Sequence, residues 1–335
     1  MVVGVDGKFR LAIVGMALVA LFGTIFFFGS FSQTNSQTGL IVGTAVQNVQ
    51  VKTGYLQITA SLPLFVALEK GFFKDEGIEI SAIPFESSNP IMDAISKGDL
   101  DFSPAVSWET LFAVEQRAPG AFKTIAHNFE DDAHPVSALI VKKDRGIAKT
   151  TDLEGKTLLT GPGASGKGTA ELFLKNSGVD PAKVNLVQVI YSQVVPAFAA
   201  GGVDAVLIWE PASTVIVENG LGGVLVETPR SKIFQPFPTS AAVVSSKLAR
   251  EQPGVARKIQ NAILKAADFM EKNPEESKLI LAKYLKLDVA IAQKTHLYDN
   301  KQAAESIRPV QKLADLSKEL GILEKTIDVS QLVFK

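Results

Sequence analysis

The chain has 335 residues, a formal net charge of −1 and no cysteine, a length that fits one large domain or two of ordinary size. Charged residues make up 21% and apolar residues 46%, which excludes a largely disordered chain, and the near-zero charge argues against a nucleic-acid-binding protein. The lack of cysteine excludes disulfides, thiol nucleophiles, iron–sulfur clusters, cysteine-ligated zinc and the lipid anchor of a bacterial lipoprotein.

An apolar stretch at residues 11–29 carries no charged side chain over its nineteen positions. As a helix rising about 1.5 Å per residue, it would span roughly the hydrocarbon thickness of a bilayer. Lys8 and Arg10 precede it, and no Lys, Arg, Asp or Glu follows before Lys52. The positive-inside rule therefore predicts that residues 1–10 lie in the cytoplasm and that the bulk of the chain lies outside it.

Two interpretations of this stretch remain open. We expect an uncleaved transmembrane anchor at 11–29, because the apolar core exceeds the about 7–15 residues of a signal peptide and the best cleavage site is only Ser30-Phe31-Ser32. The alternative is a cleaved signal sequence and export to the periplasm. A buried core helix is disfavoured because the stretch is apolar on every face. Residues 30–51, rich in Ser, Thr, Gln and Asn, are expected to be a flexible polar linker.

The body of the chain, from residue 52 onward, alternates strand patterns with helix patterns. Strands are predicted at 53–59, 78–85, 100–106, 122–128, 137–143, 156–161, 184–191 and 203–210, and helices at 63–73, 89–99, 108–117, 168–176 and 194–202. Beyond this region, helical apolar stripes begin at Val255 and at Ile307. The alternation predicts an α/β fold with largely parallel sheets, followed by a helical C-terminal part.

A weak internal repeat suggests two similar lobes. Gly98-Asp99-Leu100-Asp101 precedes Trp108-Glu109 much as Gly201-Gly202-Val203-Asp204 precedes Trp209-Glu210, and these are the only two tryptophans. Two lobes that each present a Trp-Glu pair just beyond a strand would form a ligand cleft, since ligands in open α/β sheets bind beyond the carboxyl ends of strands. The alternative is that both tryptophans are core residues.

The glycine-rich segment GPGASGKGT at 161–169 lies between a predicted strand and a predicted helix. Gly161, Gly166 and Lys167 fit the spacing of a nucleotide-binding loop, but that loop needs Ser or Thr directly after the lysine, where this chain has Gly168. A glycine-rich turn that leads into a helix is nevertheless an anion site, with free N–H groups and a positive dipole end. Ser165 can add a hydroxyl donor; whether Lys167 contacts a ligand stays open.

The segment HNFEDDAH at 127–134 gathers two histidines and three acids. Asp131 and Asp132 could supply oxygen ligands to a metal ion, but the gap between His127 and His134 matches no common zinc spacing. We therefore interpret this segment as a solvated acidic loop, and we expect neither a metal nor a cofactor.

Four segments together resemble a known family: ASLPLFVALEKGFFKDEGIEI at 60–80, ISKGDLDFSPA at 95–105, DLEGKTLLTGPGAS at 152–165 and GGVDAVLIWEP at 201–211. They are similar, in the same order, to the nitrate/sulfonate/taurine-type (SsuA/THI5-like) substrate-binding proteins of ABC transporters. The resemblance covers about 53–245 and implies a type II periplasmic-binding-protein fold, with two α/β lobes joined by a hinge. Lobe 1 is then expected to contain 52–145 and 240–335, and lobe 2 to contain 146–239.

In this family the ligand lies where the loops after the strands converge with helix N-termini. Carried over by motif, the resemblance implies ligand contacts at Ser61, Ala105, Ala164, Ser165, Trp209 and Glu210. Trp108, from the internal repeat, and Gly166, from the glycine-rich segment, complete the predicted set. Helix N-termini favour an anionic group, whereas Glu210 and Trp209 favour an ammonium group, so a zwitterion such as an aminoalkyl sulfonate fits both.

The resemblance implies an extracytoplasmic solute-binding protein of an ABC importer, which closes its hinge on a small anionic or zwitterionic solute of the sulfonate or taurine kind. Its partners would be the permease, through it a cytoplasmic ATPase, and the membrane that holds the N-terminal helix. A thiamine-type pyrimidine ligand, an enzyme on the same two-lobed scaffold and a sensory ligand-binding module are alternatives. The cysteine-rich motif of the pyrimidine-synthesising branch is absent from this chain, which argues against that enzyme.

Overall fold

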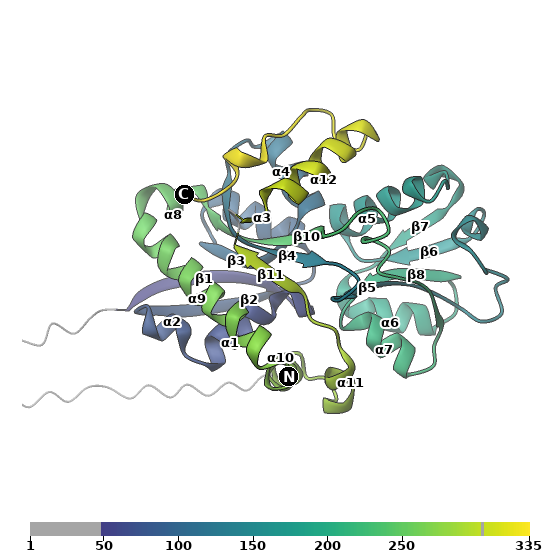
Figure 1. The fold of residues 1–335 in the computed structure, drawn as a ribbon, viewed down its shortest axis with the longest axis horizontal. Helices are drawn as coiled ribbons and strands as arrows, with labels where there is room; N and C mark the ends of the chain where they lie inside the picture. The colour runs from purple at the N-terminus through teal and green to yellow at the C-terminus, as the bar shows by residue number, and fades with distance from the viewer. Residues whose placement is uncertain (1–47, 303–304) are drawn as a thin grey trace, which may run out of the picture. The chain divides into compact units, whose positions relative to one another are not determined.

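The computed structural model describes residues 48–302 and 305–335, and the alternating pattern folds there into two separate β-sheets with helices around each (Figure 1). The expected anchor at 11–29, the cytoplasmic residues 1–10 and most of the expected linker lie outside these residues. Among the residues that are described, none of the helices combines the length and the apolar character that crossing a bilayer requires. The first strand begins at Val49, within the last residues of the expected 30–51 linker.

The larger sheet has six strands in the order β11-β4-β10-β3-β1-β2. Their bounds are β1 Val49–Leu56, β2 Ile78–Phe85, β3 Phe102–Ser107, β4 Phe122–Glu130, β10 Phe237–Ser245 and β11 Asp299–Gln302. β1 pairs in parallel with β2 and β3, whereas β10 is antiparallel to both β3 and β4. This sheet and the helices packed on it are called lobe 1 below.

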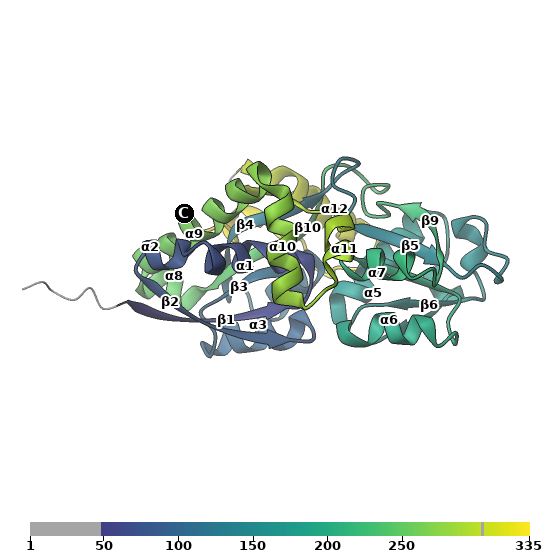
Figure 2. The same ribbon diagram turned by 90° about the horizontal axis from the view of Figure 1, so that it is seen from below.

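The smaller sheet has five strands in the order β7-β6-β8-β5-β9, and it forms lobe 2 together with the helices that follow its strands (Figure 2). The strand bounds are β5 Ser137–Val141, β6 Thr157–Thr160, β7 Asn185–Gln188, β8 Ala205–Trp209 and β9 Gly223–Glu227. β6 runs parallel to β7 and β8, whereas β5 is antiparallel to β8 and β9. Both sheets are therefore mixed rather than purely parallel.

Each predicted helix is present, most with shifted ends, the one predicted at 63–73 is divided in two, and the helix at 212–218 was not predicted. The bounds of the helices are α1 Leu62–Glu69, α2 Phe72–Asp75, α3 Ser88–Lys97, α4 Trp108–Arg117, α5 Gly163–Asn176, α6 Tyr191–Ala199, α7 Ala212–Glu218, α8 Ser246–Glu251, α9 Pro253–Lys272, α10 Pro274–Leu285, α11 Val289–Lys294 and α12 Ile307–Glu319. The predicted C-terminal helices are present: α9 buries Ile259, Ala262 and Ala266, and α12 buries Val310 and Leu313. α5 begins five residues before the predicted helix, inside the glycine-rich segment.

The chain crosses between the lobes at 131–136, from β4 to β5, and again at 228–236, from β9 to β10. These crossings correct the expected lobe boundaries of 145 and 240. β5 was expected in lobe 1 but pairs with β8 and β9 in lobe 2, and β10 already begins lobe 1 at Phe237. Strand periodicity shows that a segment is extended, but it does not identify the sheet in which the segment finds its partners, which explains both shifts.

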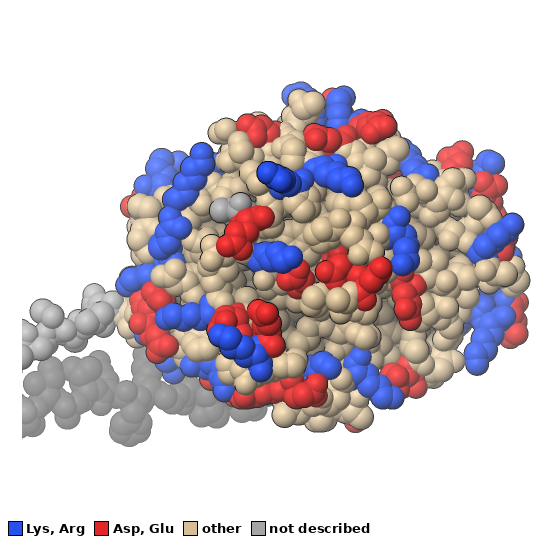
Figure 3. Space-filling view, in the orientation of Figure 1, with Lys and Arg blue, Asp and Glu red and all other residues tan. Residues whose placement is uncertain are grey.

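Lys, Arg, Asp and Glu are interspersed over the face that Figure 3 shows, in agreement with the formal net charge of −1. A continuous basic surface, which is the usual electrostatic feature of a nucleic-acid-binding protein, does not occur on this face.

Candidate functional site

A small buried cavity lies where the carboxyl ends of the parallel strands in both lobes meet. Lobe 1 lines it with Leu56, Ile58, Ala60, Ser88, Ala105, Ser107, Thr239, Ser240 and Tyr298, lobe 2 with Ser165, Tyr191 and Trp209, and the second crossing with Arg230. About 20 Å³ of the cavity admits the centre of a water molecule. This is room for roughly one water molecule, so the two lobes must move apart to admit an organic solute.

Arg230 supplies the one positive charge among the described residues that line this cavity. It is 3% exposed, and its guanidinium carbon lies 4.5 Å from the centre of the Trp209 ring. Its Nε atom is buried and donates to no described residue. A buried charge is costly unless it is paired and hydrogen-bonded, so an anion in the cavity would satisfy this group.

Two serines stand in the first turns of helices that border the cavity. Ser88 begins α3, is 3% exposed, and its hydroxyl has no partner among the described residues. Ser165 lies in the first turn of α5 and is likewise 3% exposed. The N-terminus of a helix carries free N–H groups and a partial positive charge, so both first turns favour an anion in the cavity. One of them belongs to each lobe.

Two buried acids lie near Arg230 without lining the cavity. Burial raises the pKa of Glu109 and of Glu130, and the charge of Arg230 acts in the opposite direction on both. Glu109 accepts a hydrogen bond of 2.9 Å from Thr169 Oγ1 of lobe 2, and Glu130 accepts one of 3.4 Å from the backbone N–H of Ser231. Arg230 thus lies in an acidic surrounding, while the cavity itself presents its guanidinium and hydroxyl groups.

Of the eight site residues predicted from the sequence, the structure brings Ala105, Ser165 and Trp209 to the cavity wall. Ser61 is fully buried, Ala164 stands beside Ser165 in the first turn of α5, and neither lines the cavity. Trp108 does not line it either. Its ring is buried against Phe112 and His127, with centroids 5.3 and 5.1 Å away, as expected of a core tryptophan.

Glu210 is buried, does not line the cavity, and its carboxylate has partners within the protein. Its oxygens accept hydrogen bonds from Thr214 Oγ1 at 2.7 Å, from Thr214 N at 3.3 Å and from His296 N at 3.5 Å. Burial raises the pKa of this carboxyl to about 7. The interpretation of Glu210 as a structural acid therefore accounts for its contacts, and the carboxylate that favoured an ammonium-bearing ligand is already occupied by the protein.

The glycine-rich segment packs tightly instead of forming a nucleotide-binding loop. A Cβ on Gly166 would lie 1.8 Å from the carbonyl oxygen of Gly161, and one on Gly168 would lie 3.0 Å from Glu109 Cγ of lobe 1. Because α5 already begins at Gly163, Gly166 and Lys167 belong to the helix, and Lys167 forms an exposed ion pair with Glu171 at 3.7 Å. These glycines let lobe 2 approach lobe 1 closely.

No sequence pattern indicated Arg230, Ser88 or Tyr298 as site residues. Arg230 follows Pro229 on the second crossing, within no recognised motif. Ser88 is one of several serines before a predicted helix, and Tyr298 precedes the short strand β11, which no pattern predicted. Only the three-dimensional arrangement of the two crossings and the two helix ends distinguishes these residues from their neighbours.

Comparisons with known proteins identify the family and the fold. A family model described as NMT1/THI5 like matches residues 58–277. A protein of Brucella abortus, named as a candidate binding protein, is 30% identical over 254 residues, which are 72% of this chain and 74% of the relative. The taurine-binding periplasmic protein of Escherichia coli is 25% identical over 308 residues, 87% of this chain and 94% of that protein.

Among solved structures, the alkanesulfonate-binding protein SsuA from Xanthomonas axonopodis pv. citri, bound to MOPS, superposes with a TM-score of 0.72. It is 19% identical in sequence, and the match covers 85% of this chain and 98% of that one. This likeness shows that the chain has the two-lobed periplasmic-binding-protein fold.

Proposed function

Since this chain belongs to the NMT1/THI5-like family, we propose that it is the solute-binding protein of an ABC importer and captures a small organic anion between its two lobes. The observation that carries the anionic preference is Arg230, a buried guanidinium whose Nε has no partner among the described residues, at the wall of the cavity between the lobes. The named relatives are binding proteins, so we propose binding and release here, without catalysis.

Capture would proceed by closure of the lobes on the solute. The solute would contact Ser88 from lobe 1, Ser165 from lobe 2 and Arg230 from the crossing between them. Because no single lobe offers all three contacts, the solute would bind the closed form more tightly than the open form and shift the population toward it. The permease would then receive the closed, loaded protein.

A sulfonate or a comparably small oxyanion fits the chemistry of the cavity. Its oxygens could accept from the Arg230 guanidinium and from the hydroxyls of Ser88 and Ser165, while Trp209, Tyr191 and Tyr298 would contact a short organic group. None of the described residues that line the cavity carries a carboxylate, which favours a simple alkanesulfonate over a zwitterion such as taurine. A pyrimidine cation of the thiamine type is disfavoured, because it would lie against the buried positive charge of Arg230.

We further propose that residues 11–29 anchor the protein in the cytoplasmic membrane, with the described residues on the extracytoplasmic side, where the family captures its solutes. Cleavage of this stretch and release to the periplasm is the alternative. Mass analysis of the protein isolated from native membranes separates the two, because a mature N-terminus near Gln33 would contradict the anchor.

The charge of Arg230 provides the test of the proposed function. Calorimetric titration with ethanesulfonate should show binding to the wild type and a loss of affinity of roughly 30-fold or more in Arg230→Gln, because truncating a buried charge contact typically costs about 2–5 kcal/mol. Arg250→Gln is the matched control, since Arg250 is exposed and paired with Glu251 at 3.1 Å. Equal affinities for ethanesulfonate in the two variants would refute the role of Arg230.

A further inference from the structure

The first crossing between the lobes brings together three side chains of metal-ligating type that are distant in sequence. Asp131 and His134 stand at the two ends of the turn that follows β4, where they form an isolated β-bridge. Asp299 begins β11, which pairs with β4 opposite Phe129. One ligand atom from each of the three lies within 4.8 Å of the other two.

The arrangement differs from the one that the sequence suggested. His127, the other histidine of the HNFEDDAH segment, is fully buried and contacts Ser306 Oγ through Nδ1 at 2.8 Å, and burial lowers its pKa to about 3. Asp132 instead turns toward Lys232, at 3.4 Å. The spacing of the two histidines, which argued against zinc, therefore has no bearing on a site that takes its third ligand from β11.

We propose that Asp131, His134 and Asp299 form a binding site for a divalent first-row transition metal ion, of which Zn²⁺ is the best match. In tetrahedral zinc sites the N and O ligands lie about 2.0–2.2 Å from the metal, so their mutual separation is about 3.3 Å. The observed ligand-atom separations, all within 4.8 Å, are of the same order. The imidazole favours zinc, nickel or copper over magnesium and calcium, which prefer oxygen ligands alone.

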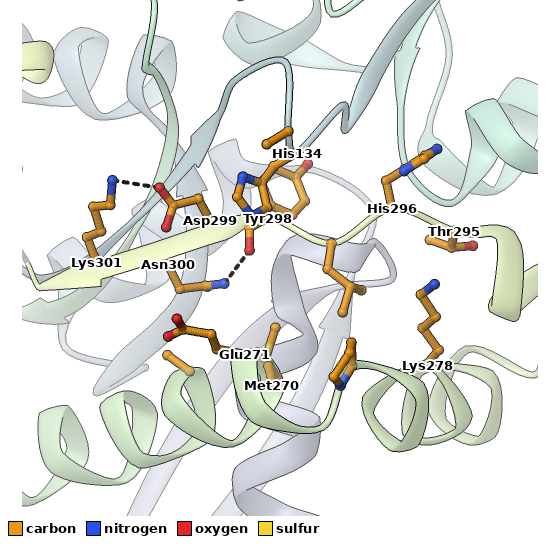
Figure 4. Close-up of a pocket in the computed structure, with 14 residues that line it drawn as sticks. His134, Met270, Glu271, Lys278, Thr295, His296, Tyr298, Asp299, Asn300 and Lys301 are labelled. Carbon is orange, nitrogen blue, oxygen red and sulfur yellow. Dashed lines mark hydrogen bonds and ion pairs between the residues drawn. The ribbon is translucent and has the colours of Figure 1, made fainter.

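The three side chains are accessible to an ion from solvent. The exposed fractions are 40% for His134, 27% for Asp131 and 18% for Asp299. His134 and Asp299 lie side by side at the edge of a hollow of about 570 Å³, bounded by α9, α10 and the segment before β11 (Figure 4). The hollow leaves room for the water or exogenous ligand that completes the coordination of a three-residue site.

The charges around the cluster favour a cation and identify its competitor. Asp131 Oδ1 accepts hydrogen bonds from the backbone N–H of Ala133 and of His134, both at 2.9 Å, and lies 2.8 Å from His134 Nδ1. Asp299 is paired with Lys301 at 2.7 Å, as the dashed line in Figure 4 shows. A metal ion would have to share Asp299 with Lys301, which implies moderate affinity in the wild type and tighter binding when Lys301 is removed.

Calorimetric titration of the full chain with zinc chloride tests this site. We expect one equivalent of Zn²⁺ to bind, a loss of affinity of at least about tenfold in His134→Gln and in Asp299→Asn, and tighter binding in Lys301→Gln. His296→Gln is the matched control, because His296 lines the same hollow but is no member of the cluster, and its affinity for zinc should equal that of the wild type.

Absence of saturable binding at about 100 µM zinc, or equal affinities in His134→Gln, Asp299→Asn and the wild type, would overturn the proposal. Melting temperatures measured without metal verify that each variant folds. The absorption spectrum of bound Co²⁺ adds a second readout, since the bands of the wild type should change or disappear in a folded His134→Gln variant. The test uses no organic solute, so its outcome is independent of the proposed transport function.

Discussion

A methyl group added at Gly168 should weaken solute binding without weakening the folded protein. Gly168 lies on α5 of lobe 2, and a Cβ there would lie 3.0 Å from Cγ and 3.1 Å from Cβ of Glu109 on α4 of lobe 1. These separations are a few tenths of an ångström shorter than normal van der Waals contacts. Glu109 cannot easily move aside, because Thr169 Oγ1 holds its carboxylate at 2.9 Å.

The size of the effect follows from where the clash occurs. Overpacking a close contact typically costs about 1–3 kcal/mol, which corresponds to roughly 5- to 150-fold in the dissociation constant if the cost is present only when the lobes are closed. Within the helix itself, Ala is more favourable than Gly by about 1 kcal/mol. Gly168→Ala should therefore keep or raise the melting temperature of the unliganded protein while it lowers the affinity for ethanesulfonate.

Paired calorimetric titrations and thermal melts of the wild type and Gly168→Ala measure both quantities. The clash needs both side chains, so it is absent from the double variant Gly168→Ala/Glu109→Ala. The affinity of the double variant for ethanesulfonate should therefore equal that of Glu109→Ala alone. An unchanged affinity in Gly168→Ala, or a melting temperature that falls in step with it, would refute the reasoning that α4 and α5 meet only on closure.

Three further predictions follow from the contacts at and around the cavity. Ser88→Ala should lower affinity for ethanesulfonate roughly 10- to 150-fold in titrations, since a hydrogen bond to a charged group contributes about 1.5–3 kcal/mol, and unchanged affinity would exclude Ser88 from the site. Trp108→Ala should lower the free energy of unfolding in urea by about 3–5 kcal/mol, and a near-neutral effect would contradict its place in the core. The pKa of Glu210 is raised to about 7 in the folded protein, so the folded state holds this proton more tightly than the unfolded state does. The stabilisation by this proton is present below about pH 4.5 and is lost as the pH rises to about 7. The free energy of unfolding in urea should therefore fall less over this pH range in Glu210→Gln than in the wild type. Equal pH dependence of the two free energies would refute this.

Most strands and helices could be predicted from the sequence because they carry their own periodicity, whereas β9, β10 and β11 were not predicted. Three residues of the cavity wall could also be predicted. Ala105, Ser165 and Trp209 lie at or just after the ends of strands that converge in an α/β fold. The sheet to which β5 belongs could not be predicted, because its apolar run Ser137–Val141 is equally suited to either sheet. Only its pairing with β8 and β9 decides this.

The residues that sequence patterns misjudged share a physical cause. Trp108 is equivalent in the internal repeat to Trp209, which lines the cavity, and Glu210 directly follows Trp209. Yet the Trp108 ring packs into the core, and the Glu210 carboxylate accepts hydrogen bonds from Thr214 and His296. Arg230 shows the reverse case, because a residue on an irregular crossing has no periodicity to reveal its burial. The direction of a side chain and the path of a crossing depend on the tertiary structure, so sequence periodicity does not predict them.

The most direct test of the account is a crystal structure of the protein with bound 2-bromoethanesulfonate, whose bromine is located by its anomalous scattering. We predict a sulfonate in the cavity between the lobes, within hydrogen-bonding distance of Arg230 and of at least one of Ser88 and Ser165, with the lobes closed around it. A solute bound elsewhere on the protein, or a sulfonate in the cavity that leaves Arg230 without contact, would contradict the claim that this guanidinium captures the anion.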